Sequence, residues 1–409
     1  MVKLCDNIDC TGCSACSNTC GQGAILMQPN NKGFLHPIID TEKCIVCGAC
    51  MKVCPILNEN EFRKPSDQTA RKGWAHDDNI VSNSSSGGLF TLLADYVLEN
   101  KGHVYGACFD TINWKLQHVK VDNFNDLEQL RGSKYLQSEI RDAYKEVRKD
   151  LNNGKEVLFV GTPCQISGLH FFLHNKKYPN LLTVDLVCHG VPSPVVFKAY
   201  TDYLRDLKGS DLVQYYFREK KWCWTRFNSL AVFKNGSVSR GKWEEDIYMR
   251  GFLRELFLRD SCHNCRFANM NRQGDITLAD YWAYRHKRGE IRNKERGCSL
   301  ILMNNEKGRE VIRQILPRMV SYPMSIEEAR IGNQALSKCF PKNPLSDSFW
   351  KDFHDKGFSG IIDKYLYPEP IPIYYRLIYK FGKSSLFFKF YIIIRKVFQL
   401  GKIVISRKK

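Results

Sequence analysis

The pattern of apolar and polar positions along the chain predicts a mixed α/β protein. Short apolar runs bounded by turn-forming residues predict strands at 103–110, 116–122, 156–160 and 181–187. Apolar residues that recur every three to four positions predict helices at 89–102, 197–209 and about 307–318. The first two strands are expected to pair with each other. A small hairpin is expected at 33–40, and a helix is expected towards the end of 127–140.

The order strand, helix, strand between 156 and 187 is typical of a parallel α/β unit. Ligands of such units sit at the carboxyl ends of the strands. Cys164 and Cys188 both follow predicted strand ends. We therefore expect chemistry at this edge of the sheet.

The same pattern divides the chain into domains. Residues 1–58 are predicted to form a small ferredoxin-like domain, and the polar residues 59–72 a linker. A larger mixed α/β (α+β) domain is expected at 73–355, with parts at about 73–150 and 151–320. A basic, aromatic, amphipathic helical tail is expected at 356–409.

Cysteine spacing supplies the first chemical signal. Nine of the 17 cysteines lie in the first 54 residues, and eight of these form two C-x2-C-x2-C-x3-C runs. Three cysteines of such a run wrap one [4Fe–4S] cluster, and the fourth binds the other cluster. One cluster is therefore predicted on Cys10, Cys13, Cys16 and Cys54. The other is predicted on Cys44, Cys47, Cys50 and Cys20.

Zinc and disulfides are the alternatives at these cysteines. Zinc sites use separated C-x2-C pairs, and disulfides need an oxidising compartment, so both fit the two runs less well. The first run departs from the usual pattern, because Gly21 stands where a proline is common. Cys5 is left over and is expected to be a free thiol.

Composition and charge limit the classes of protein to which the chain could belong. The chain has 409 residues, 43% of them hydrophobic and 25% charged, as in a folded soluble protein. Much of the net charge of +18 lies in residues 371–409, and no nucleic-acid-binding motif occurs, so nucleic acid is excluded as a partner. No signal peptide is expected, and reduced cysteines indicate the cytoplasm.

A serine- and glycine-rich loop precedes the predicted helix at 89–102. Such a helix start offers free N–H groups to an anion. Ordinary N-capping is the simpler interpretation, and local sequence leaves both open.

A second set of cysteines is dispersed along the larger domain. Its members are Cys164, Cys188, Cys262 and Cys265. Four thiols from three places could converge on a third cluster. Buried structural thiols and a zinc site are the alternatives, and spacing alone does not decide among them.

Seven motifs in order resemble the family of coenzyme F-420 (deazaflavin) hydrogenase/dehydrogenase beta subunits, which includes 7-hydroxymethyl chlorophyll a reductase. They are SSGG at 85–88, GSKYLQS at 132–138, GTPCQ at 161–165, DLVCHGVPSP at 185–194, FREK at 217–220, RDSCHNC at 259–265 and DITLADYW at 275–282. The match spans roughly residues 73–315 and follows the two cysteine runs. The last 90 or so residues fall outside it.

The resemblance implies an FAD-containing iron–sulfur flavoprotein whose third [4Fe–4S] cluster is held by the dispersed cysteines. It also implies a flavin-phosphate role for Ser85, Ser86, Gly87 and Gly88. The residues implied to line or approach the flavin are Ser133, Lys134, Tyr135, Gly161, Thr162, Asp280 and Trp282. Lys134 is the candidate for a charge near the reduced ring, and a solvated surface cation is its alternative.

These parts predict an electron relay that connects a ferredoxin-like or deazaflavin carrier to an organic substrate. The direction of flow, the substrate and the oligomeric state stay open, a homo-oligomer included. A non-catalytic electron-transfer subunit is the main alternative, and a zinc-stabilised scaffold is another.

The tail suggests where the relay works. Residues 371–409 alternate aromatic and basic residues without an apolar run long enough to span a membrane. We expect them to lie on an anionic membrane surface, or else to cover the protein's own core or a partner. A role in surface-polysaccharide or glycolipid synthesis is a hypothesis from this location.

Overall fold

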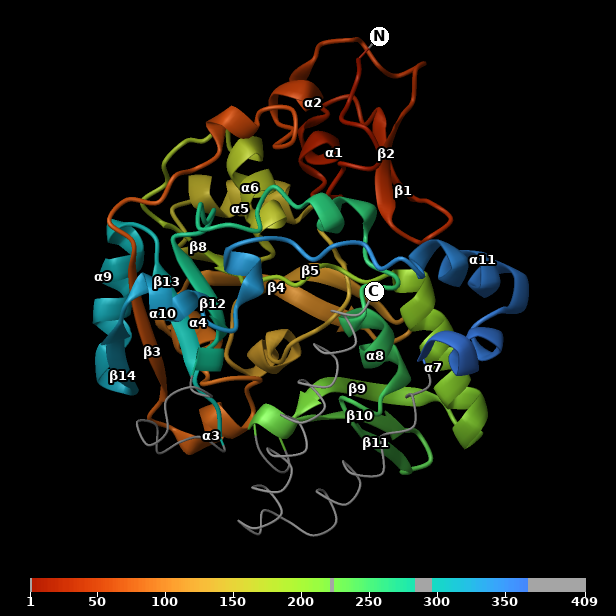
Figure 1. Cartoon of the computed structure of the whole chain (residues 1–409). Helices are drawn as coiled ribbons and strands as arrows, with labels where there is room; N and C mark the ends of the chain where they lie inside the picture. The colour runs from red at the N-terminus through yellow and green to blue at the C-terminus, as the bar shows by residue number, and fades with distance from the viewer. Residues whose placement is uncertain (1, 221–223, 284–295, 367–409) are drawn as a thin grey trace, which may run out of the picture. The chain divides into compact units, whose positions relative to one another are not determined.

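The computed structural model describes residues 2–220, 224–283 and 296–366. The chain up to Tyr365 folds as one compact unit, and a second unit begins at Leu366. The predicted tail segment at 371–409 lies outside the described residues. The labelled helices and strands of Figure 1 belong to the first unit.

A nine-stranded sheet runs through the described part of this unit (Figure 1). From edge to edge its strands are β14 (Met319–Met324), β3 (Thr69–Ala75), β13 (Ser299–Met303), β12 (Ile276–Asp280), β8 (Leu181–Leu186), β7 (Val157–Gly161), β4 (His103–Asp110), β5 (Lys115–Val121) and β6 (Ser138–Glu139). The central strands β12, β8, β7 and β4 are mutually parallel. Strands β14, β3, β13 and β5 join the sheet through antiparallel pairs. The sheet is therefore mixed, which confirms the predicted fold class.

Two predictions about this sheet are confirmed. The strand pair expected at 103–110 and 116–122 is the antiparallel pair of β4 and β5. The expected parallel unit consists of β7 and β8, which α6 (Pro163–Phe172) connects. Gly161 lies opposite Asp185, so both strands end at one edge of the sheet.

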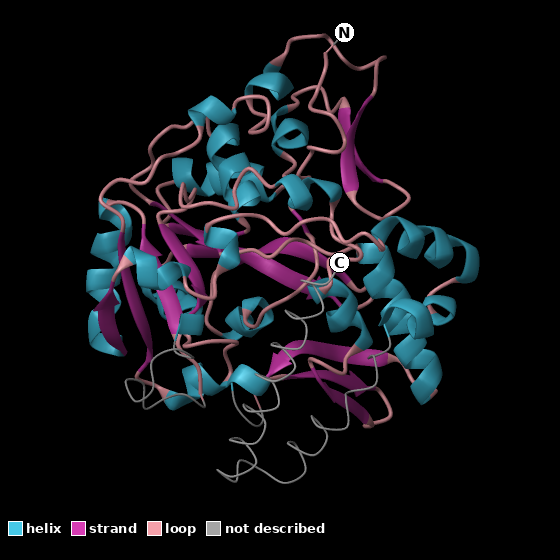
Figure 2. Cartoon of the chain, in the orientation of Figure 1, coloured by secondary structure: helices cyan, strands magenta, loops and turns pink. Residues whose placement is uncertain are grey.

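Helices cover both faces of the sheet (Figure 2). Neighbouring residues on a strand point to opposite faces. Leu158 therefore packs with α4 (Leu89–Glu99) and α9 (Glu306–Ile315), whereas Phe159 packs with α5 (Ala143–Asn152) and α6.

A second, three-stranded antiparallel sheet consists of β9 (Leu212–Glu219), β10 (Asn228–Phe233) and β11 (Val238–Lys242). Aromatic side chains hold α7 (Pro194–Lys208) and α8 (Ile247–Leu253) against it. Phe197 of α7 lies 5.4 Å from Phe217 of β9, and Tyr200 lies 5.6 Å from Tyr248 of α8, between ring centroids.

The N-terminal module contains α1 (Ala15–Thr19), α2 (Ala49–Lys52) and a hairpin of β1 (Ile25–Pro29) and β2 (Leu35–Ile39). The hairpin expected at 33–40 is therefore wrong in extent, because those residues supply mainly its second strand. Ala15 and Val53 join the core that α5 and α6 form. The module is thus packed on that helical layer.

The helix expected towards the end of 127–140 is also wrong. The segment contains a 3-10 helix (Asn125–Leu130) and β6, and the next α-helix begins at Ala143. Gly132 has a φ of 81°, a left-handed conformation that stops helical continuation.

The segment 59–72 packs against the larger domain. A 3-10 turn (Glu59–Glu61) opens it, and Phe62 stacks on Phe267 with 4.8 Å between ring centroids. Arg63 forms an ion pair with Asp275 at 3.3 Å. The other described elements are α3 (Asp78–Ser82), α10 (Ile326–Arg330), α11 (Ser346–Lys356), 3-10 turns at Trp224–Arg226, Asp260–Asn264, Leu316–Arg318, Gln334–Leu336 and Ser359–Ile361, and a π-helical turn at Ile362–Leu366.

Candidate redox site

Four cysteines from the two runs surround one cavity in the N-terminal module. They are Cys10, Cys13, Cys16 and Cys54. Cys10 and Cys13 lie in the loop that leads into α1, Cys16 lies in α1 itself, and Cys54 follows α2. Apolar side chains such as Met27 and Ile56 complete the wall. The structure thus brings together the four residues that were predicted to share one cluster, which we name the first cysteine site.

A second group of thiols is centred on Cys50. Burial raises the pKa of the Cys50 thiol, and the neighbouring Cys20 and Cys47 thiols raise it further. Cys20 is the C-cap of α1, Cys47 lies just before the N-cap of α2, and Cys50 lies in the first turn of α2. Cys44 is three residues before Cys47 in the same loop. This group is the second cysteine site.

The two cysteine loops repeat the same backbone conformation. Two and four residues after its first cysteine, each loop has a residue with positive φ. These residues are Gly12 (68°) and Ser14 (61°) in one loop, and Val46 (57°) and Gly48 (73°) in the other. Left-handed residues in such loops aim successive N–H groups into a concavity that binds anions and Fe–S clusters. The sequence repeat is therefore also a repeat of geometry.

Backbone N–H groups point at the cysteine sulfurs. The Ala24 N–H donates to Cys20 Sγ at 3.3 Å. Burial raises the pKa of the Cys13 and Cys16 thiols, and the N–H groups of Ala15 and Ser17 lower it again by donating to these sulfurs. Such donors favour the thiolate, which is the form that binds metal.

The four dispersed cysteines of the larger domain also come together. They are Cys164, Cys188, Cys262 and Cys265, named here the third cysteine site. Burial raises the pKa of Cys188 to about 12, and the Cys164 and Cys265 thiols contribute to the rise. The pKa of Cys262 is raised by burial and then by the other three. These mutual effects place four thiols in one electrostatic environment.

Strand ends and short turns position the third site. Cys164 is in the first turn of α6, Cys188 follows β8, and Cys262 lies in the turn Asp260–Asn264. The Val191 N–H donates to Cys262 Sγ at 3.4 Å. Thr162 Oγ1 lies 3.1 Å from Cys164 Sγ. The structure thus places Thr162, with its neighbour Gly161, at the third cysteine site.

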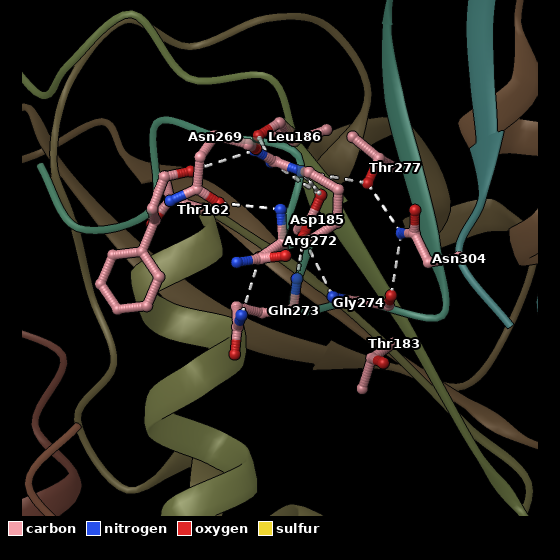
Figure 3. Close-up of polar contacts among 12 residues, drawn as sticks. Thr162, Thr183, Asp185, Leu186, Asn269, Arg272, Gln273, Gly274, Thr277 and Asn304 are labelled. Carbon is pink, nitrogen blue, oxygen red and sulfur yellow. Dashed lines mark hydrogen bonds and ion pairs between the residues drawn. The ribbon is translucent and has the colours of Figure 1, made fainter. Parts of the chain in front are cut away.

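A buried ion pair between Arg272 and Asp185 lies next to the third cysteine site. Arg272 donates to Asp185 at 2.9 Å, and both side chains are almost fully buried. The same guanidinium donates to the carbonyls of Leu186, Phe267 and Asn269 (Figure 3). It therefore ties the end of β8, just before Cys188, to the loop that follows Cys265.

Arg259 connects the first and third cysteine sites. Its Nε donates to the Cys10 carbonyl at 2.7 Å, and one Nη donates to Gln137 Oε1 at 3.0 Å. Gln137 donates in turn to the Thr11 carbonyl at 3.0 Å. The Arg259 carbonyl accepts the Cys262 N–H at 2.9 Å. A continuous chain of bonds thus links Cys10 to Cys262.

Helix α6 provides a second contact between these sites. Gly168 lies one turn after Cys164, and an added Cβ at Gly168 would stand 3.1 Å from Cys13 Sγ. Four residues of helix rise about 6 Å. The first and third cysteine sites are therefore adjacent.

The serine loop contacts the 132–138 motif and the start of β13. Ser85 Oγ accepts the Ser133 N–H at 2.6 Å, and Ser86 Oγ donates to the Cys298 carbonyl at 3.0 Å. The Gly87 N–H donates to Ser299 Oγ at 2.9 Å. Gly88, the last residue of the motif, is the N-cap of α4 with a φ of 87°. The loop is thus joined to the 132–138 motif.

Lys134 and Tyr135 are adjacent in sequence but contact different groups: Lys134 bonds backbone carbonyls, whereas Tyr135 packs against an aromatic ring. Lys134 Nζ donates to the carbonyls of Leu130 and Arg131 at 3.1 and 2.8 Å, and burial lowers its pKa to about 8. Tyr135 stacks on Phe252 with 5.1 Å between ring centroids. Lys134 therefore caps a turn of its own segment.

A buried cation lies between Tyr135 and the 275–282 motif. Arg218 forms an ion pair with Asp280, and its guanidinium lies 5.8 Å from the centre of the Trp282 ring. Burial raises the pKa of Tyr135, and the Arg218 charge opposes the rise. Trp224 stacks on Trp282 at 5.1 Å and donates to Asp280 at 2.8 Å. Hydrogen bonds, an ion pair and ring contacts thereby connect five of the residues implied to bind flavin, namely Ser85, Ser133, Tyr135, Asp280 and Trp282.

The structural roles of three buried arginines, Arg218, Arg259 and Arg272, were not predicted from the sequence. Arg218 and Arg259 lie inside motifs that were recognised, and Arg272 lies between two of them. Their positions in or between the motifs could have marked them as candidates. The groups to which they donate, however, depend on the tertiary fold.

Two kinds of feature are absent from the described residues, 2–220, 224–283 and 296–366. No three His, Cys, Asp or Glu side chains there are close enough to hold a single metal ion. No helix there is long and apolar enough to cross a membrane. A cubane cluster differs from a single ion, because each thiolate binds its own iron atom.

Family models match most of the described chain. Those for the coenzyme F420 hydrogenase/dehydrogenase beta subunit match at residues 70–145 (N-terminal part) and 154–325 (C terminus), together more than half of the chain. Two models of 4Fe-4S dicluster domains match at 9–57 and 36–85.

Two curated relatives match over most of the chain. A subunit of the F(420)H(2) dehydrogenase of Methanosarcina mazei is 23% identical over 304 residues, which are 70% of this chain and 80% of that protein. Coenzyme F420-dependent sulfite reductase of Methanocaldococcus jannaschii is 28% identical over 68% of this chain, which spans only 46% of that protein.

A solved structure also aligns with the chain. It belongs to the F420-reducing [NiFe] hydrogenase complex of Methanosarcina barkeri. The alignment covers 74% of this chain and 93% of that chain, at 18% identity and a TM-score of 0.44.

Proposed function

The chain belongs to the family of coenzyme F420 hydrogenase/dehydrogenase beta subunits, and on that premise we propose that it is an FAD-containing iron–sulfur oxidoreductase with three [4Fe–4S] clusters. The observation that carries the proposal is the connection through Arg259 between the first and third cysteine sites. Two separate thiol groups, built by different domains, are held side by side by a buried cation. A relay needs this arrangement, whereas isolated structural thiols do not.

The cysteine sites suit the clusters by their donor sets. Each of the first and third sites offers four sulfurs, and N–H groups point at the sulfurs in both. The proposed ligands are Cys10, Cys13, Cys16 and Cys54 at the first site, Cys44, Cys47, Cys50 and Cys20 at the second, and Cys164, Cys188, Cys262 and Cys265 at the third.

The proposed flavin residues suit an anionic, planar ligand. Arg218 Nε is buried and has no hydrogen-bond partner among the described residues. Beside it lie the aromatic rings of Tyr135 and Trp282. Ser85, Ser86, Gly87, Gly88 and Ser133 would hold the phosphates, while Gly161 and Thr162 would separate flavin from the third cluster.

When bound, the clusters supply single electrons and FAD exchanges either single electrons or a hydride, so together they connect a one-electron carrier to a two-electron substrate. The chain's own residues set the geometry. Arg259 and α6 hold the first site against the third, and Arg272 holds the third site against the sheet. Asp280 keeps Arg218 charged inside the domain by pairing with it. The carrier is proposed to be ferredoxin-like or a deazaflavin.

A second candidate function is a non-catalytic electron-transfer subunit. It is favoured by the curated relative that is itself named as one subunit of a dehydrogenase. Turnover by the isolated chain, with reduced methyl viologen as donor and any soluble acceptor, would exclude it.

Location forms a separate part of the proposal. Residues 371–409 would bind an anionic membrane surface from the cytoplasmic side, which would suit a role in surface-glycan or glycolipid synthesis. Sedimentation with vesicles of anionic lipid tests this part, because truncation after residue 366 should abolish it.

The experiment that tests the relay follows reduction of the bound flavin. Anaerobic protein is mixed with reduced methyl viologen, and bleaching of the flavin absorbance is timed. The wild type is expected to bleach faster than Cys13→Ala, whose first site lacks one ligand. Equal rates, or no flavin absorbance at all, would contradict the relay.

A further inference from the structure

A cavity separate from the first cysteine site lies between the N-terminal module and the larger domain. Its volume is about 560 Å³, which falls within the range of about 300–1,000 Å³ that is usual for ligand pockets. Ser14, Met27 and Leu35 line it on the module side. The turn between β4 and β5, the segment after β6 and the start of α7 line it on the other side. The cavity is therefore built by both parts of the chain.

The wall from the larger domain carries three cations and one carboxylate. These residues are Lys115, Arg141, Lys198 and Glu139. Lys115 Nζ lies 3.9 Å from Glu139, which is long for an ion pair. Lys198 pairs with Asp202 at 2.6 Å, but Arg205 pairs with the same carboxylate at 3.1 Å. Asp202 therefore does not neutralise both of its partners, and the wall keeps an excess of positive charge.

An aromatic side chain lies in the same wall. Trp114 lines the cavity and is largely buried. Its ring packs on Phe109 and Phe197, with 5.8 and 6.4 Å between ring centroids. Met27 lines the cavity on the module side. A ligand in this cavity would therefore meet apolar surface as well as cations.

Two of these wall residues have an unusual backbone conformation. Trp114 has a φ of 53° and Arg141 a φ of 51°. A left-handed conformation is uncommon for bulky residues, and residues held in it gather at ligand sites. The module holds Arg141 in place, because buried Asn18 of α1 donates to the Arg141 carbonyl at 2.7 Å. The side chains that carry the charge and the ring thus start from fixed, strained positions.

We propose that this cavity binds a small organic anion, such as a carboxylate, sulfonate or phosphate ester, that carries an apolar or aromatic group. Lys115, Arg141 and Lys198 bind the anionic group, and Trp114 contacts the apolar group. Because the walls come from both parts of the chain, the ligand bridges the module and the larger domain. The proposal does not depend on the cluster or flavin assignments.

The test uses anilinonaphthalene sulfonate, a probe that combines a sulfonate with aromatic rings. Its binding to anaerobically purified full-length protein is measured by isothermal titration calorimetry. The wild type is expected to show one saturable site, and R141Q/K198M is expected to bind about tenfold more weakly. Lys208→Met is the matched control, because Lys208 is exposed at the other end of α7, and it should bind as the wild type does. Absence of saturable binding, or equal affinity in R141Q/K198M and the wild type, would overturn the proposal.

A neutral probe guards against a variant whose cavity has changed shape. Phenylnaphthylamine has the same ring system without the sulfonate. It should bind the wild type and R141Q/K198M with equal affinity, since only the charge of the wall differs. A loss of affinity for this probe as large as that for the sulfonate would overturn the role of the cations.

Amide hydrogen exchange locates the bound probe. With anilinonaphthalene sulfonate present, exchange is expected to fall in residues 25–35, 111–117 and 139–141 together, because these segments surround the cavity. Saturable binding that leaves exchange in all three segments unchanged would place the probe elsewhere and overturn the proposal.

Discussion

Arg259 Nε donates to the carbonyl oxygen of Cys10 at 2.7 Å, across the boundary between the N-terminal module and the larger domain. The side chain is 1% exposed, and its remaining donors reach Gln137 and the Leu35 carbonyl. One buried side chain therefore fixes the position of the first cysteine site relative to the third, although the two sites belong to different parts of the sequence.

Replacing Arg259 with methionine should loosen the module. The change leaves several buried acceptors without donors, at about 1–3 kcal/mol for each. Amide hydrogen exchange measured by mass spectrometry should rise in residues 10–36, while β7 and β8 stay protected. Arg259→Lys should give an intermediate rise, because lysine keeps the charge but not the planar fork. An unchanged exchange pattern in both variants would contradict this role.

Replacing Arg272 with methionine should damage the third cysteine site. The change leaves Asp185 as a buried, unpaired carboxylate, which typically destabilises by about 3–5 kcal/mol. Urea unfolding should report the loss, and iron per chain should fall by about four atoms. Arg266→Met is the matched control, because Arg266 is exposed and its ion pair with Glu59 spans 3.6 Å. Full iron in R272M would show that the ion pair does not position these cysteines.

The repeat of left-handed residues makes Val46 a strained position. Val46 has a φ of 57° and is 60% exposed, whereas Gly12 fills the corresponding position of the other loop. A left-handed conformation costs a residue with a Cβ about 1–2 kcal/mol. Val46→Gly should therefore raise the urea midpoint of the anaerobic protein.

The opposite change at the matching position should have the opposite effect. A Cβ at Gly12 would stand 2.8 Å from the Arg259 guanidinium, so Gly12→Ala should lower the midpoint. A midpoint that moves the same way in both variants would contradict the equivalence of the loops.

Buried His118 should make stability depend on pH. Burial lowers its pKa to about 4, and its ring bonds Ser138 Oγ at 2.8 Å and the Val160 carbonyl at 3.0 Å. The unfolded chain, with a histidine pKa of about 6.5, then binds more protons, so stability falls as pH drops below about 6.5. Between pH 7.5 and 5.5 this group should account for a loss of about 1 kcal/mol.

Urea unfolding at several pH values measures this loss. His118→Gln should flatten the dependence, and the exposed His354→Gln should leave it as in the wild type. A wild-type slope in H118Q would remove His118 as the cause.

Much of the fold was predictable because its signals are local. The strands β4, β5, β7 and β8 are apolar runs between turn residues, and their parallel or antiparallel pairing follows from the length of the connections. The helix expected near 127–140 failed for a local reason as well, since the left-handed Gly132 redirects the chain.

The candidate site was predictable only in part. The spacing of the two runs indicated which cysteines share the first site, because a run of this spacing supplies three ligands to one cluster and its fourth cysteine to the other. The convergence of Cys164, Cys188 and Cys262 depends on which strands are neighbours. The partners of Arg259 lie more than 120 residues away, so no local pattern could indicate them.

Three clusters and one flavin on this single chain are the core of the proposed relay. Iron, acid-labile sulfide and flavin per chain, measured on anaerobically purified wild type and Cys188→Ala, test them most directly. We expect about twelve iron atoms and one FAD for the wild type, and about eight iron atoms for C188A. About eight iron atoms in both proteins would contradict the relay and leave the third cysteine site as structural thiols.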